Sequence, residues 1–177
     1  VYGLLAQDMT LANDKRSITF VLHPKVRFSN GDPVTAQDVK FSFDTLNSKA
    51  AAPQYRAILS DVLRAVIVDA RTIRYEFKRV NSELPLIVAT LPVFSPKWLN
   101  GKTIDKLALD RPIASGPYLI EKYDLGRRIT YRHDPNYWGW DIPARRGTYN
   151  FERVTYIFYK DNLARLEAFK ASEFDFI

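Results

Sequence analysis

The sequence predicts an α+β (mixed α/β) domain, a mixed sheet with packed helices. Segments with an apolar residue at every second position indicate strands, and segments with apolar residues three or four positions apart indicate helices. The two kinds of segment do not alternate strictly, which favours a mixed or antiparallel sheet. The chain has 177 residues, of which 46% are hydrophobic and 26% charged, so it can bury a sizeable core.

The first well-marked strand is expected over residues 17–22, where Ile18, Phe20 and Leu22 share one face. Residues 29–33, with the sequence Ser-Asn-Gly-Asp-Pro, then form a turn, because Asn-Gly tolerates the positive φ that tight turns require.

A helix is expected after this turn, with Thr35 as its N-cap and an end near Asn47. Asp38, three residues after the cap, suits the positive end of the helix dipole. The buried stripe of this helix is Val39, Phe43 and Leu46. After a linker over residues 48–53, a second helix is expected, with an inward stripe of Ile58, Leu59, Val62 and Leu63.

The remaining elements are predicted from the same two periodicities. Strands are expected over residues 65–68, 72–77, 118–123, 128–132 and 153–160, and a last strand from Phe174 onward. Helices are expected over residues 84–91 and 161–171, with one short helix at about 104–109 in the otherwise irregular stretch 92–116. The helix over 161–171 should direct Leu163, Leu166 and Phe169 inward.

Composition and motifs exclude or disfavour several kinds of chemistry. The chain has no cysteine, which excludes disulfides, thiolate zinc sites, iron–sulfur clusters and a cysteine nucleophile. Its two histidines, His23 and His133, stand far apart at a strand end and before a turn. There is no glycine-rich phosphate loop, no Gly-x-Ser-x-Gly motif and no run near the ~20 apolar residues of a membrane span. A hydrolase using Asp134 or Asp141 is the enzyme alternative.

The net charge of +6 raises the question of a nucleic-acid partner. The basic excess is spread evenly along the chain, which is typical of a mildly basic soluble surface rather than a binding stripe. A nucleic-acid-binding module remains an alternative. It would use the pairs Arg127/Arg128 and Arg145/Arg146, and a steep salt dependence of DNA binding would support it.

Ordered blocks of the sequence resemble a known family. The first block, residues 20–43, contains Val26-Arg27-Phe28, the Asn30-Gly31 turn and Thr35-Ala36-Gln37-Asp38-Val39. The later blocks are Ala114-Ser115-Gly116-Pro117-Tyr118, Arg132-His133-Asp134-Pro135-Asn136-Tyr137-Trp138-Gly139 and, at the end, residues 168–175. In this order they are similar to the signature of the family 5 extracellular solute-binding proteins, the oligopeptide, dipeptide and nickel receptors of bacterial ABC importers.

The resemblance covers nearly the whole chain and has three departures. Members of the family often have Arg where His23 stands, and Gly where Ala114 and Ser172 stand. These departures leave the family in place and its subgroup open.

The resemblance implies a fragment of a type II periplasmic-binding-protein fold. Residues 1–110 would be the accessory domain, and residues 111–177 the first strands and helix of an incomplete main lobe. Both ends of the sequence, at Val1 and at Ile177, are expected to be cut ends. The implied protein is the monomeric substrate-binding component of an ABC importer, periplasmic or exported to the cell surface. It would capture peptides or similar small solutes and deliver them to a permease in the inner membrane.

The resemblance also implies the site. No catalytic residue, metal or cofactor is expected. The residues expected to face the ligand are Tyr55, Val93, Phe94, Ser115 and Gly116. The same residues also allow simpler interpretations, in which Tyr55 packs on its own domain and Ser115-Gly116 is a turn before a strand. Tyr137 and Trp138 are expected to form the core of a turn and are left out of the site.

Overall fold

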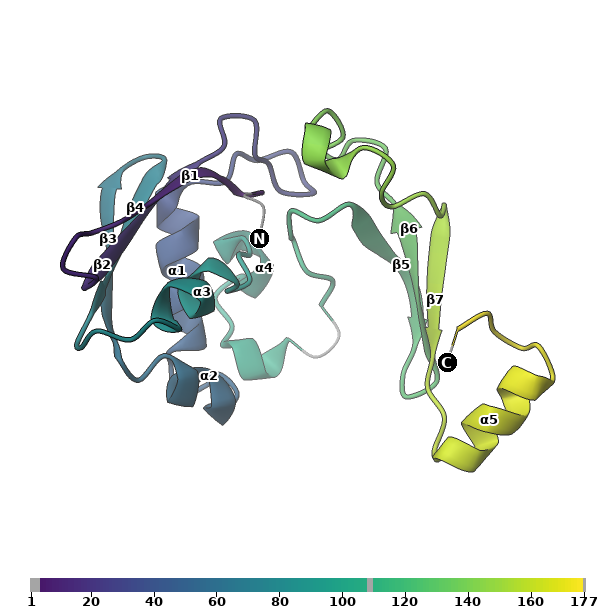
Figure 1. Cartoon of the computed structure of the whole chain (residues 1–177). Helices are drawn as coiled ribbons and strands as arrows, with labels where there is room; N and C mark the ends of the chain where they lie inside the picture. Colours follow the sequence, from purple (N-terminus) through teal and green to yellow (C-terminus); the bar gives the residue numbers. More distant parts are fainter. Residues whose placement is uncertain (1–3, 108–109, 177) are drawn as a thin grey trace. The chain divides into compact units, whose positions relative to one another are not determined.

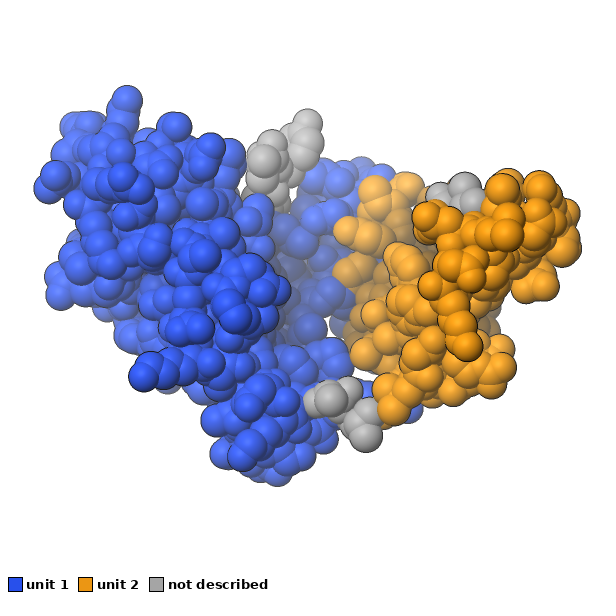
Figure 2. Space-filling view, turned by 90° about the horizontal axis from the view of Figure 1, so that it is seen from below, with its two compact units in different colours: residues 1–116, 136–146 blue, residues 117–135, 147–177 orange. Residues whose placement is uncertain are grey.

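The computed structural model describes residues 4–107 and 110–176. The chain divides into two units, residues 1–116 with 136–146 and residues 117–135 with 147–177, which Figure 2 shows in blue and orange. The expected assignment of residues 1–110 to an accessory domain and of residues 111–177 to a main lobe stays a prediction. The expectation that both ends are cut concerns Val1 and Ile177, which lie outside the described ranges.

Unit 1 contains a four-stranded antiparallel sheet in the order β1-β2-β4-β3 (Figure 1). Its strands are β1 (Ala6–Leu11), β2 (Ser17–Leu22), β3 (Val62–Asp69) and β4 (Thr72–Phe77). Buried and half-buried residues alternate strictly along β2 and β4. The predicted face of Ile18, Phe20 and Leu22 is therefore confirmed as the core face of the sheet.

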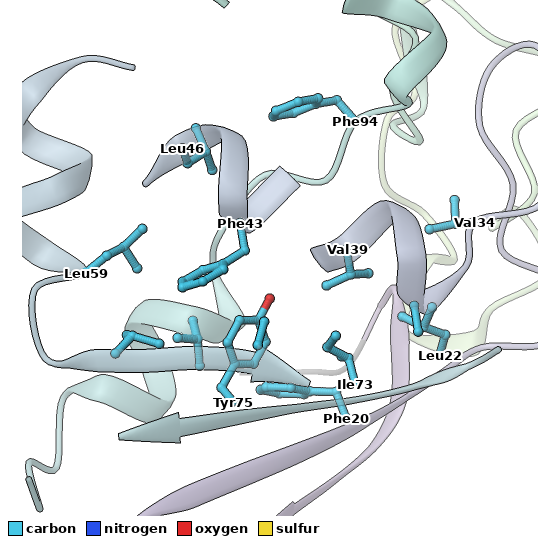
Figure 3. Close-up of a cluster of buried hydrophobic side chains, with 14 of the residues drawn as sticks. Phe20, Leu22, Val34, Val39, Phe43, Leu46, Leu59, Ile73, Tyr75 and Phe94 are labelled. Carbon is cyan, nitrogen blue, oxygen red and sulfur yellow. The ribbon is translucent and has the colours of Figure 1, made fainter. Parts of the chain in front are cut away.

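Helix α1 (Ala36–Leu46) covers this face of the sheet. A capping box begins the helix, because the Asp38 N–H donates to Thr35 Oγ1 and the Thr35 N–H donates to an Asp38 carboxylate oxygen at 2.8 Å. The predicted stripe of Val39, Phe43 and Leu46 is buried, as Figure 3 shows. Phe43 meets the edge of Tyr75 on β4 with ring centroids 5.5 Å apart. Burial raises the pKa of the Tyr75 phenol.

Unit 1 also contains three short helices: α2 (Pro53–Ile58), α3 (Leu84–Ala89) and α4 (Pro96–Leu99). The expectation that Val62 and Leu63 continue the second helix is wrong. Helix α2 ends at Ile58, and Val62 begins β3 opposite Phe77. Leu63 is 55% exposed because successive residues of a strand point to opposite faces. The spacing of these residues is compatible with a helix or with a strand, and hydrogen bonding to β4 makes the segment a strand.

Two further elements of unit 1 were not expected from the sequence. Strand β1 pairs with β2 at the edge of the sheet, and five of its six residues are exposed, so it shows no alternation of buried and exposed residues. Helix α4 lies in a stretch expected to be irregular, where Ser95 caps it through a bond from the Lys97 N–H. A short helix was expected at about 104–109. The structure has a 3₁₀ helix at Ile104–Lys106, and residues 108–109 lie outside the described ranges.

Unit 2 contains a three-stranded antiparallel sheet in the order β5-β6-β7, followed by one helix. The elements are β5 (Tyr118–Asp124), β6 (Arg128–His133), β7 (Arg153–Ile157) and α5 (Asn162–Lys170). Asp161 caps α5 through a bond from the Ala164 N–H. Strand β7 ends at Ile157, three residues before the predicted end.

The inward stripe predicted for α5 is wrong in this structure. Leu163, Leu166 and Phe169 are 70%, 40% and 38% exposed, and only Ala168 of this helix is buried. The predicted strand at Phe174 is also wrong, since residues 171–176 contain no strand. The Phe174 ring instead lies 5.6 Å from the rings of Phe169 and Tyr159. No described helix is both long and apolar enough to cross a membrane.

Candidate functional site

Two of the segments expected to face the ligand lie side by side in unit 1. The Ser95 N–H donates to the carbonyl oxygen of Ile113 at 3.1 Å, which joins the chain after Val93 and Phe94 to the chain before Ser115. A backbone hydrogen bond between segments so distant in sequence holds them in one register. Val93, Phe94, Ser115 and Gly116 thus belong to one pair of neighbouring segments.

Phe94 is the anchor of the first segment. Its side chain is 5% exposed and meets the edges of the Phe41 and Trp98 rings at 6.2 and 5.4 Å. The buried Ser42 hydroxyl of α1 accepts the Phe94 N–H at 3.0 Å, and its oxygen lies 3.2 Å from the Phe94 carbonyl oxygen. These contacts fix the backbone of residue 94 to the core. Figure 3 draws Phe94 with the other buried side chains of the core cluster. A ligand contact by Phe94 stays a prediction.

Val93 is half-buried and lines an apolar cavity of about 380 Å³ inside unit 1. The cavity lies between strands β1, β2 and β4, helix α1, and α3 with the loop after it. Its other linings include Met9, Phe20, Phe43, Tyr75, Val88 and Leu91. Most of this lining is apolar, which suits an apolar group, and Gln7 and Asp8 of β1 are its polar members near that strand. Of the five expected site residues, Val93 is the one that this cavity contains.

The second segment is held by hydrogen bonds to its carbonyl oxygens. The Ser29 N–H donates to the Ala114 oxygen at 2.7 Å, and the Trp138 indole N–H donates to the Ser115 oxygen at 3.1 Å. Gly116 is exposed, and a Cβ built on it would meet nothing within 4 Å. The described chain therefore has no steric need for glycine there, and the backbone at Gly116 is open to approach.

The turn before α1 is tied to the same region. Lys97 of α4 donates to the Asp32 carboxylate at 2.7 Å, and Asn30 donates to the same oxygen at 2.7 Å. The hydrogen bond from Lys97, followed by that from Asn30, lowers the pKa of the Asp32 carboxyl. The turn over residues 29–33 therefore bonds to both segments: Ser29 to Ala114 in the second, and Asp32 to Lys97, which follows the first.

Tyr55 lies in α2 and is half-buried against the hydrophobic core of unit 1. Its carbonyl oxygen accepts the Leu59 N–H at 3.0 Å, so its backbone is part of the helix. The packing expected of a structural tyrosine is present, and its exposed part leaves a ligand contact as a prediction.

The groups named for other chemistries do not form a site within one unit. Asp134 belongs to unit 2 and Asp141 to unit 1. The His23 ring lies 5.4 Å from the Trp138 ring, and the His133 ring lies 5.9 Å from Tyr118. Within residues 4–107 and 110–176, no three His, Asp or Glu side chains gather as metal ligands would.

Sequence reasoning missed Trp138. It was placed in the core of a turn, and the structure does pack it half-buried beside the buried Tyr137. Its indole N–H, however, donates to the segment expected to face the ligand. Trp138 and Ser115 are 23 positions apart, and nothing in the sequence indicates that they form a hydrogen bond.

The whole chain, residues 1–177, matches the family model described as bacterial extracellular solute-binding proteins, family 5 Middle. A peptidoglycan-binding protein YepA of Agrobacterium fabrum is 32% identical over 177 residues, which cover 99% of this chain and 29% of the relative. A protein of the same organism named "Probable peptide-binding protein YejA" is 33% identical over 183 residues, covering 99% of this chain and 30% of the relative.

Among solved structures, NikA from Brucella suis in complex with Fe(III)-EDTA aligns with a TM-score of 0.78 and 27% identity, covering 98% of this chain and 34% of NikA. The predicted mixed α/β fold of the type II periplasmic-binding-protein kind is thereby confirmed. The chain spans about 30% of the length of these relatives. The matched family comprises solute-binding proteins rather than enzymes. The chain belongs to the family 5 bacterial extracellular solute-binding proteins.

Proposed function

We propose that the chain is part of the substrate-binding component of an ABC importer, which captures peptides or similar small solutes outside the inner membrane. The observation that carries this proposal is the family match over all 177 residues. The names of the two Agrobacterium relatives, one peptidoglycan-binding and one peptide-binding, support ligands with a peptide part. The partner would be a permease of the inner membrane, and the receptor would be a periplasmic or exported monomer.

The proposed ligand-facing residues are Tyr55, Val93, Phe94, Ser115 and Gly116. The exposed backbone at Gly116 would let a ligand backbone approach closely, since no side chain shields it. Val93 would offer apolar surface, and Tyr55 an aromatic face with a polar tip. Phe94, held by Ser42, would keep the Val93 backbone in place.

Capture would involve closure around the ligand by a hinge motion, and no bond of the ligand would be broken. Contacts to the ligand would offset the loss of freedom on closure. Because the chain spans about 30% of its relatives, most ligand contacts would come from residues outside it. The 177-residue chain alone should therefore bind peptides weakly or not at all. Micromolar binding of a peptide to this chain in a calorimeter would contradict that expectation.

The test of the function uses the complete gene product that contains these residues. Isothermal titration calorimetry with the dipeptide Met-Leu, the tripeptide Ala-Ala-Ala and a stem tetrapeptide of peptidoglycan should reveal micromolar or tighter binding of at least one probe. Intact probe should be recovered after incubation. Absence of binding to all three, or cleavage of a probe, would reject a peptide receptor.

The Tyr55 contact is tested in the same protein. Tyr55→Ala should weaken binding of the best probe about tenfold, because truncating an aromatic anchor removes contact area. Arg56→Ala, an exposed neighbour on the same helix, is the matched control and should leave affinity unchanged. Equal affinity of Tyr55→Ala and the parent protein, with an unchanged melting temperature, removes Tyr55 from the site.

A further inference from the structure

We infer that Trp138 is a positioning residue, which holds the Ser115–Gly116 peptide so that the Gly116 N–H is presented to a hydrogen-bond acceptor of the ligand. The acceptor would be a carbonyl or carboxylate oxygen, as a peptide carries. This inference rests on the proposed function for its ligand, and on the geometry of unit 1 for its mechanism.

The Trp138 indole N–H donates to the Ser115 carbonyl oxygen at 3.1 Å, a normal hydrogen-bond length. The preceding carbonyl, that of Ala114, accepts the Ser29 N–H at 2.7 Å. Two successive carbonyl oxygens are therefore occupied by donors from distant parts of the sequence. The orientation of both peptide groups is set by these bonds.

The planarity of the peptide bond extends this constraint to Gly116. All described peptide bonds are trans, so the Ser115 carbonyl and the Gly116 N–H share one plane and point in opposite directions. When Trp138 holds the carbonyl, the N–H is directed away from Trp138. Among residues 4–107 and 110–176, no group accepts a hydrogen bond from this N–H. It is an exposed donor of fixed direction.

Trp138 itself is held on more than one side. The His23 ring lies 5.4 Å from the indole, and the buried Tyr137 ring lies 5.6 Å from it. Gly139 makes this packing possible, because a Cβ at that position would come within 2.6 Å of the Tyr137 ring. The indole is thus a fixed support rather than a mobile surface side chain.

The positioning is measured without any ligand on the 177-residue chain. Ser115-Gly116 is the only Ser-Gly pair of the sequence, so labelling Ser carbonyls with ¹³C and Gly amides with ¹⁵N yields one carbonyl-to-amide NMR cross peak. Trp138→Phe keeps an aromatic ring but removes the donor. It should shift this peak in the carbonyl dimension and broaden it.

Trp98→Phe is the matched control, because Trp98 also donates its indole N–H to a backbone carbonyl at 3.1 Å, that of Asp110. It should leave the Ser115–Gly116 peak in place. An unmoved peak in Trp138→Phe overturns the inference. If Trp138→Phe fails to fold, the unmutated chain still decides, since a Trp138 indole proton that exchanges as fast as a free indole shows that the bond is absent.

The consequence for the ligand is measured in the complete gene product with the peptide probe that binds best. Trp138→Phe should bind it about fivefold more weakly, the effect of one misplaced hydrogen bond, and the exposed control Arg56→Ala should bind it unchanged. A shifted cross peak with unchanged affinity overturns the link to the ligand. If no probe binds the unmutated protein, the proposed function fails, while the cross peak still decides the positioning by Trp138.

Discussion

The two units differ in what covers their sheets. Unit 1 has a continuous core between the sheet β1-β2-β4-β3 and helix α1, with Leu46, Leu59, Ile73 and Leu84 at most 2% exposed. In unit 2 the buried residues within the described ranges are Thr130, Asp134 and Ala168. Alternating sequence is enough to pair strands into a sheet, but a core requires a second layer against it.

The apolar face of the unit 2 sheet is recognisable from its register. Ile120 lies opposite Tyr131, Tyr131 opposite Val154, and Ile129 opposite Tyr156, so these apolar residues share one face. The other face is polar, with Arg153 bonded to Glu121 and Thr130 to Thr155. Tyr156 is 58% exposed on the apolar face. The strands of unit 2 alternate apolar and polar residues as those of unit 1 do, but their apolar side chains are less buried.

The comparison is tested most directly by one leucine from each unit. Leu46→Ala in α1 should lower the free energy of unfolding by about 2–5 kcal/mol, because it leaves a cavity in a packed core. Leu163→Ala in α5, whose side chain is 70% exposed, should change it by less than about 0.5 kcal/mol. Urea titrations followed by circular dichroism measure both. Equal effects would show that α5 is as well packed as α1.

A second test compares two glycines of unit 1. Gly139→Ala should lower stability by about 1–3 kcal/mol, because the new Cβ overlaps the Tyr137 ring. Gly116→Ala should leave stability unchanged, since its Cβ meets nothing within 4 Å. Thermal melts of the two variants check this. A destabilised Gly116→Ala chain would mean that the loop is packed rather than open.

A third test compares buried hydroxyls of the two units. Ser42→Ala removes the acceptor of the buried Phe94 N–H and should cost about 1–3 kcal/mol. Thr130→Val removes a bond to Thr155, whose side chain is exposed and can bond to water, so its cost should be below about 1 kcal/mol. Chemical unfolding of each variant gives the difference. The reverse order would contradict the contrast in burial.

The smallest effect is expected from exposed ion pairs, which occur in both units. Hydrogen bonds from Lys97 to Asp32 and from Arg153 to Glu121 lower the pKa of each carboxyl. A carboxyl whose pKa is lower in the folded state stabilises that state at pH values above its pKa in the unfolded chain. This stabilisation is lost as the pH falls through its pKa in the folded state. Both pairs should therefore weaken only in acid. Lys97→Met and Arg153→Met should each slightly reduce the loss of stability below about pH 4.

The local elements of the fold could be predicted where sequence pattern and burial agree. The face of Ile18, Phe20 and Leu22 and the Thr35 cap followed from spacing alone, because a strand or helix with one apolar face has one consistent orientation. Strand β1 could not be predicted, because its apolar residues alternate only at Met9 and Leu11 and five of its six residues are exposed. The boundary between α2 and β3 could not either, because the residues around Val62 fit both periods until β4 pairs with them.

The sequence predicted which residues belong to the candidate site, but not how they are arranged in space. Resemblance placed Val93, Phe94, Ser115 and Gly116 in it, and the structure joins their segments through Ser95 and Ile113. Trp138 was left out because its aromatic packing explained it completely. A hydrogen bond to a backbone carbonyl leaves no trace in the residue type at the acceptor.

The sequence by itself determined the class of the fold, most of its elements and the family, because these depend on local periodicity and on ordered motifs. The tertiary structure alone decided which apolar stripes find a second layer: that of α1 is buried, and that of α5 stays exposed. It also decided which carbonyls are held and which N–H groups stay open at Gly116. Burial and hydrogen-bond direction depend on residues distant in sequence, and periodicity carries no information about such partners.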